Sequence, residues 1–242
     1  MGAVIGVTYA SRIDWYDAVL DMKLDDFPGP ATAPKKGGSG IFDFARTVIN
    51  TLGVLRAMVF DWGPGAPARN SGIGEVRKLV GGGRLNESRV PVAVTATDLR
   101  SGERIVLRTA RSDDAVYASG ALAGVLPPLE LQDWLLADGA YTDLAPVDVA
   151  RELESAVVIA VDVGSVDRAS RISNGYEAII RAMEICHRQH AHLRFAEADL
   201  VLRPRFLRGI DTLEFSALRE CVAAGIRIVR AERSRIRKLL EE

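Results

Sequence analysis

The sequence is poor in several features that would mark particular classes of protein. It has only two cysteines, Cys186 and Cys221, which are too few for a disulfide framework and favour a reducing compartment. It has no run of about 18 to 20 consecutive apolar residues, the length that a membrane-spanning helix needs. Its 31 basic and 32 acidic residues nearly cancel, whereas a nucleic-acid-binding protein carries a basic excess. We therefore expect no disulfide scaffold, no spanning helix and no nucleic-acid partner.

The first residues also lack the basic segment, apolar run and cleavage site of a signal peptide. The expected location is therefore cytoplasmic, with peripheral contact to a membrane as an open alternative. Hydrophobic residues make up 48% of the 242 residues, which fits a globular protein. Neither an internal repeat nor an interdomain linker is visible, so the sequence predicts a single domain over residues 1–242, of unknown oligomeric state.

The middle of the chain is arranged around an Asp-Gly dipeptide. Two leucines and an alanine at 135–137 lead into Asp138-Gly139, and these two residue types favour tight or left-handed turns. A β-branched apolar run at 157–163 follows, which predicts a strand buried on both faces. A helix between the turn and this strand predicts a crossover connection and a parallel or mixed sheet.

Local patterns predict the remaining elements. Helices are expected over 2–10, 14–22, 41–60, 75–80, 112–120 (with Ser112 as N-cap), 147–154, 173–193 and most of 215–242, strands over 90–99, 104–108 and 199–202, and loops over 27–40 and 61–74. The three glycines at 81–83 follow a helix, not a strand. They favour a helix stop over a phosphate-binding loop, because glycine is the usual residue after a helix end.

Several short motifs follow one another between residues 90 and 163. They are the strand end A-T-D-L at 96–99, the turn S-G-E at 101–103, the helix A-V-Y-A-S-G-A at 115–121, the bend G-V-L-P-P at 124–128 and the turn D-G-A at 138–140. In order and spacing, these motifs resemble the second half of a patatin-like phospholipase domain. The segments 199–204 and 224–226 resemble later parts of the same family. The resemblance implies an α/β, three-layer fold whose central, mostly parallel sheet is flanked by helices.

The same resemblance implies a lipid acyl hydrolase, a phospholipase or esterase with a Ser-Asp dyad and no cofactor or metal. Asp138 would be the proton acceptor of the dyad, and Gly139 would let the backbone turn tightly beside it. Ala140 stands where many members carry a second glycine. The implied substrate is a lipid or another acyl ester.

The nucleophile that the family requires is not found, because the sequence contains no complete G-x-S-x-G. Residues 1–10 resemble the segment that follows the nucleophile, with Gly2 as the last glycine of the motif. The serine, the first strand and the oxyanion glycines would then lie upstream, and the chain would be truncated just after the serine. Ser39 does not fit, because Ile41 occupies the place of the second glycine. The alternative is a degenerate member that binds lipid or a partner without turnover.

Other polar residues have weaker claims to a functional role. Asp98, at the end of a strand, is expected to orient the turn at 101–102, and a structural role is favoured for Asp162. The three histidines, His187, His190 and His192, are distant in sequence from the Asp-Gly turn, so a Ser-His-Asp triad is not expected. A zinc site at these histidines is a minor alternative, because a catalytic zinc needs three suitably placed ligands.

Overall fold

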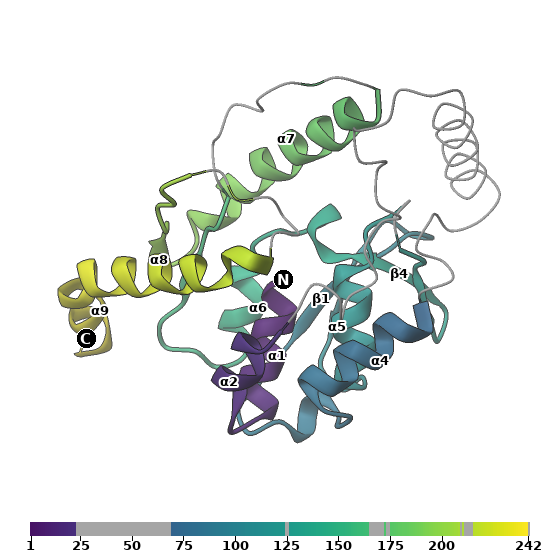
Figure 1. The fold of residues 1–242 in the computed structure, drawn as a ribbon, viewed down its shortest axis with the longest axis horizontal. Coiled ribbons are helices and arrows are strands. Elements are labelled where there is room, and N and C mark those ends of the chain that lie inside the picture. The colour runs from purple at the N-terminus through teal and green to yellow at the C-terminus, as the bar shows by residue number, and fades with distance from the viewer. Residues whose placement is uncertain are drawn as a thin grey trace, which may run out of the picture. The chain divides into compact units, whose positions relative to one another are not determined.

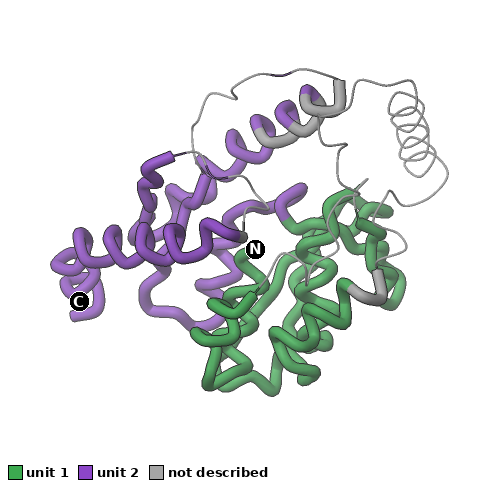
Figure 2. The backbone as a smooth tube through the Cα atoms, viewed as in Figure 1, with its two compact units in different colours: residues 1–139 green, residues 140–242 purple. Residues whose placement is uncertain are grey.

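The computed structural model describes residues 1–22, 69–123, 126–164, 172, 175–208, 210 and 215–241. The chain divides into two compact units, residues 1–139 and 140–242 (Figure 2). The single domain expected from the sequence stays a prediction. The loop at 27–40, the helix at 41–60 and Ser39 lie outside the described residues.

Unit 1 contains a four-stranded sheet in the order β2-β1-β4-β3, in which every neighbouring pair is antiparallel. Its strands are β1 (Val94–Asp98), β2 (Arg104–Leu107), β3 (Leu129–Leu131) and β4 (Trp134–Asp138). The expectation of a mostly parallel sheet is wrong for this unit. The reason is local, because β1–β2 and β3–β4 are hairpins with short turns, which can join only antiparallel strands. Gly102 and Gln132 adopt positive φ in these two turns.

The helices of unit 1 are α1 (Gly2–Ser11), α2 (Trp15–Leu20), α4 (Arg69–Val80) and α5 (Ser112–Gly120), with a short 3-10 helix η3 (Leu85–Glu87) (Figure 1). Among them, α5 packs directly on the sheet, α1 and α4 pack on α5, and α2 packs on α1. Apolar side chains of α1, α4, α5 and the strands form one buried cluster, in which Val7, Val80, Leu85, Ala96 and Leu136 are almost fully buried. The helix predictions for 2–10, 14–22 and 112–120 are confirmed.

Two details of these helices differ from the sequence prediction. The expected loop at 61–74 is wrong over residues 69–74, which belong to α4, because burial of the face with Val76 and Val80 outweighs the low helix propensity of two glycines. The N-cap of α5 is Arg111, and Ser112 is its first helical residue. The glycine stop is confirmed, since Gly81 follows α4 with a φ of +79°.

Unit 2 contains two paired strands and several helices. Its elements are α6 (Val147–Arg151), β5 (Ile159–Val161), α7 (Gly175–Phe195), β6 (Leu200–Leu202), the 3-10 helix η5 (Phe215–Ala217), α8 (Leu218–Ala231) and α9 (Arg233–Glu241). β5 and β6 pair in parallel, as the crossover through α7 requires. Among the described strands, β5 and β6 are therefore the one pair with the parallel arrangement that the sequence predicted.

The strand predicted at 157–163 is shorter and more exposed than expected. Ala160 packs with Ala191 and Phe195 of α7, whereas Ile159 and Val161 are 37% and 55% exposed. Successive side chains of a strand point to opposite faces, so α7 covers only the face that carries Ala160. The prediction of a strand buried on both faces is therefore wrong.

Candidate active site

Asp138 is the last residue of β4, a strand between β1 and β3. Its backbone N–H donates to the carbonyl of Ala121 at 3.0 Å, and its carbonyl accepts the hydroxyl of Thr97 at 2.9 Å. On β1, Ala96 lies opposite it in the antiparallel register. The backbone of this half-buried aspartate is thus fixed by a strand pair, a helix end and a side chain of the same unit.

Gly139 is fixed by close packing. A Cβ at this position would lie 2.9 Å from the carbonyl carbon and 3.0 Å from the hydroxyl oxygen of Thr95, and closer still to the carbonyl oxygen. The described glycines with positive φ are Gly81 and Gly102. Glycine at 139 is therefore needed for space beside β1, and not for left-handed backbone. The tight turn expected here is present as the 3-10 helix η4 (Gly139–Tyr141).

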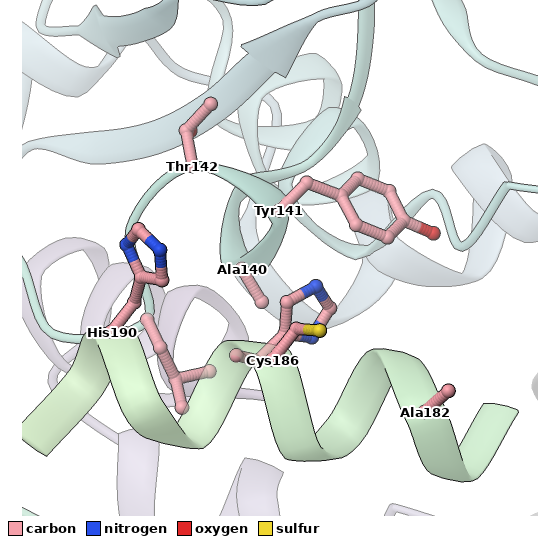
Figure 3. A pocket seen from close by; sticks show the side chains of 8 residues that line it. Ala140, Tyr141, Thr142, Ala182, Cys186 and His190 are labelled. Atoms are coloured by element: carbon pink, nitrogen blue, oxygen red, sulfur yellow. The ribbon is translucent and has the colours of Figure 1, made fainter.

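Ala140 lines a pocket of about 450 Å³ that belongs to unit 2. The lining residues come from the segment after the turn and from α7: Ala140, Tyr141, Thr142, Leu144, Ala182, Cys186, His187 and His190. Cys186 and His190 extend from α7 toward the segment of Ala140 to Thr142 (Figure 3). The pocket combines apolar walls with a few hydrogen-bonding groups, which is the usual composition of a small-molecule site.

The histidines are not as remote from the turn as their sequence separation suggested. The ring of His187 lies against that of Tyr141, with centroids 5.5 Å apart, and Tyr141 is the third residue after Asp138. Sequence reasoning missed this contact because α7 returns to the 140–144 segment only through tertiary packing. The one available signal was the placement of His187 and His190 on adjacent turns of a predicted helix.

Arg194 of α7 holds the segment that follows the turn. Its guanidinium bonds the carboxylates of Asp143 at 3.2 Å and Asp148 at 3.4 Å. The side chain of Asp143 is 1% exposed and also accepts the N–H of Ala145 at 3.0 Å. These bonds connect both ends of the 143–148 segment to the helix that forms the opposite pocket wall.

Asp98 is committed to the β1–β2 turn. It accepts hydrogen bonds from the N–H of Leu135 at 2.9 Å, from the hydroxyl of Ser101 at 2.7 Å and from the N–H of Arg100 at 3.3 Å. These bonds, the one from Leu135 first, lower the pKa of Asp98 to about 2. The prediction that Asp98 orients this turn is confirmed. On β1, Asp98 lies two residues after Ala96, the residue that faces Asp138 on β4.

Two further carboxylates have structural partners. Asp162 accepts Nε of Arg203 at 3.2 Å and the N–H of Gly164 at 3.0 Å, so the structural role favoured for it is confirmed. Asp113 is fully buried and pairs with Arg77 and Arg111, a contact that the sequence did not reveal. Burial raises the pKa of Asp113, but its bonds to the two arginines outweigh that effect and hold it below the usual value.

Within the described ranges, no group of three or more histidine, cysteine, aspartate or glutamate side chains could hold a metal ion. The expectation that the protein needs no metal or cofactor stays a prediction. In the same ranges, no helix is both long and apolar enough to cross a bilayer. Gly2 is the first residue of α1, and its assignment to a nucleophile motif also stays a prediction.

A scan against models of known protein families finds no match. Searches of curated proteins do find relatives. The chain is 41% identical over 81 residues to lysophospholipase NTE1 of Cryptococcus neoformans, which covers 34% of this chain and 5% of the relative. It is 28% identical over 163 residues to an NTE family protein of Mycobacterium tuberculosis, covering 67% of this chain and 39% of that protein.

A third relative carries the family name in its description. A patatin-like phospholipase domain-containing protein of Caenorhabditis elegans is 34% identical over 101 residues, which is 41% of this chain and 9% of the relative. With these matches, the resemblance is confirmed: the chain is a relative of the patatin-like phospholipase family. It spans between 5% and 39% of the length of these three proteins.

Proposed function

We propose that this chain carries the acid of a Ser-Asp dyad in a lipid acyl hydrolase, with Asp138 as the proton acceptor. The observation that carries the proposal is the Asp138-Gly139-Ala140 turn, which begins at the end of β4, an interior strand of the sheet, in a relative of lysophospholipases. The nucleophile would be the serine of a G-x-S-x-G motif upstream of Met1. Peripheral contact with a lipid surface is part of this proposal.

The chemistry is acyl transfer in two steps. The Asp138 carboxylate takes the serine proton while the serine oxygen attacks the ester carbonyl carbon, which gives a tetrahedral intermediate. The carbon–oxygen bond to the alcohol breaks, and the alcohol oxygen receives the proton from Asp138. Water then attacks the acyl-serine with Asp138 again as base. The carboxylic acid leaves and the serine regains its proton.

The pocket of unit 2 is proposed to bind an acyl chain. Ala140, Leu144 and Ala182 supply apolar surface, and the volume of about 450 Å³ falls within the usual range for small-molecule sites.

The first test compares ester hydrolysis by residues 1–242 and by a form extended upstream to the previous in-frame start, with p-nitrophenyl butyrate as substrate. We expect activity in the extended form. Asp138→Asn should lower its kcat by about 10²- to 10⁴-fold, the usual contribution of a general base. The matched control is Asp133→Asn, an exposed carboxylate in the β3–β4 turn. Unchanged activity in Asp138→Asn would refute the dyad assignment.

The second test uses Cys186 as a reporter in a Cys221→Ser background. We expect dodecanoate to slow the maleimide labelling of Cys186, because the acyl chain and the adduct would occupy the same pocket. Cys186→Ser, treated in the same way, is the control. If no form hydrolyses esters and dodecanoate still slows the labelling, the alternative of a non-catalytic lipid-binding protein is favoured.

A further inference from the structure

The helices α8 and α9 follow one another at the yellow end of the chain (Figure 1). Both are strongly amphipathic. In α8 only Ala224 is buried, and in α9 no residue is buried. A helix whose apolar side is so little covered by its own unit is either a packing surface or an interfacial helix.

The apolar residues of α8 lie on two parts of the helix surface, one buried and one exposed. Ala217, directly before the helix, and Ala224 are buried and mark the face that packs within unit 2. Val222 and Val229 lie about 140° around the helix from them. Val229 is 46% exposed, and Ile226, beside it at i and i+3, is 44% exposed. The helix therefore carries more apolar surface than the unit covers.

The next helix, α9, also carries an exposed apolar side chain, Leu240, which is 69% exposed. Basic residues are frequent in the same two helices. Seven basic side chains, all exposed, lie in the two helices: Arg219, Arg227, Arg230, Arg233, Arg235, Arg237 and Lys238. Residues 218–241 contain three acidic residues, Glu220, Glu232 and Glu241, so this segment carries a net charge of +4 in a chain of net charge −1.

We infer that α8 and α9 form a docking surface for anionic lipid membranes. The exposed apolar side chains would enter the boundary between head groups and acyl chains, and the arginines would contact the negatively charged head groups. The positive charge favours an anionic membrane over a second copy of the chain as the partner. Pairing two surfaces of net charge +4 would bring like charges together. The inference rests on the proposed function only in taking a lipid surface as the partner.

The test is co-sedimentation of the full chain with vesicles, one set of pure phosphatidylcholine and one with a third of phosphatidylserine. We expect binding to the anionic vesicles that weakens with added salt, and binding to the neutral vesicles at least about tenfold weaker. Hydrolysis is not the readout, so a failure of the catalytic proposal would leave this measurement unaffected.

Two double variants separate the two contributions. Arg230→Glu with Arg237→Glu, and Ile226→Ser with Val229→Ser, should each weaken binding to anionic vesicles by about tenfold or more. The matched charge control is Arg84→Glu with Arg205→Glu, and the matched apolar control is Leu193→Ser with Leu207→Ser, all exposed and outside the two helices. Both controls should bind within about twofold of the unaltered chain.

Light scattering tests the rival occupant. A dimer of the unaltered chain that Ile226→Ser with Val229→Ser converts to monomers would assign the surface to a second copy and overturn the inference. Equal binding to both vesicle types, or unchanged binding by the charge variant, would also overturn it. Circular dichroism of each variant confirms that a loss of binding does not reflect unfolding.

Discussion

The two units of the chain use their apolar residues differently. Unit 1 joins three helices and four strands in a single buried cluster, and the strand that ends in Asp138 lies inside it. The described cluster of unit 2 has three buried members, Ala145, Ala191 and Phe195, while β5 and α8 leave apolar side chains exposed. Unit 1 therefore holds Asp138, the proposed catalytic acid, in a well-packed sheet, whereas unit 2 leaves more of its described apolar side chains exposed. Substitutions should separate these roles.

The largest expected effect is loss of core packing in unit 1. Leu136 is fully buried in β4, two residues before Asp138. Leu136→Ala should lower the free energy of unfolding by about 2–5 kcal/mol, because a cavity is left that the sheet cannot close. Urea denaturation of the purified chain measures this. A loss below about 1 kcal/mol would mean that unit 1 is less tightly packed than described.

The next effect concerns the turn. Gly139→Ala places a methyl group against the Thr95 carbonyl, so β1 or the turn must move. We expect a cost of about 1–3 kcal/mol in unfolding free energy, as for overpacked sites. Gly2→Ala is the matched control, since a Cβ there meets no atom within 4 Å. Equal stability of the two variants would contradict the packing explanation for the glycine.

Asp98 gives a smaller, pH-dependent effect. Its folded pKa of about 2 lies below the unfolded value of about 3.9, so its carboxylate stabilises the fold above pH 4. That stabilisation should disappear as the pH falls from about 4 to about 2. Melting curves of the unaltered chain and of Asp98→Asn should therefore differ at pH 6 and converge near pH 2. A constant difference over this range would show that Asp98 acts through shape and not through charge.

The smallest effect is expected in the exposed strand of unit 2. Val161→Ala should change the unfolding free energy by no more than about 0.5 kcal/mol, because the side chain is 55% exposed. Val158, which is 5% exposed just before the strand, provides the contrast, and Val158→Ala should cost more. If Val161→Ala is as costly as Leu136→Ala, the proposed difference between the units is wrong.

Local signals in the sequence predicted much of the fold. The β1–β2 hairpin, α5 and the stop at Gly81 depend on turn residues and periodicity within about ten positions. Such local signals can be read from a single sequence. The antiparallel pairing of β1 with β4 and the exposure of β5 depend on which segments meet in space. No local pattern encodes that, and the predictions of a mostly parallel sheet and of a fully buried strand failed for this reason.

The candidate site divides in the same way. Asp138 and Gly139 were identifiable because their motif is contiguous, but the reason for the glycine was not, since Thr95 is far away in sequence. The pocket joins residues 140–144 to α7, more than 35 positions later, and the bonds from Arg194 to Asp143 and Asp148 span similar separations. Such contacts form only after the chain has folded.

The crowding at Gly139 has a consequence for how sequences of this kind can diverge. The second residue of the D-G-A turn is limited by the backbone of a neighbouring strand, so substitution there disturbs the sheet. The third residue, Ala140, already carries a methyl group that forms part of the pocket wall. Variation can therefore accumulate at the third position without loss of the fold, and each change there alters the shape of the cavity. Drift at this one residue would thus change what the proposed acyl-chain pocket accepts while the sheet stays intact.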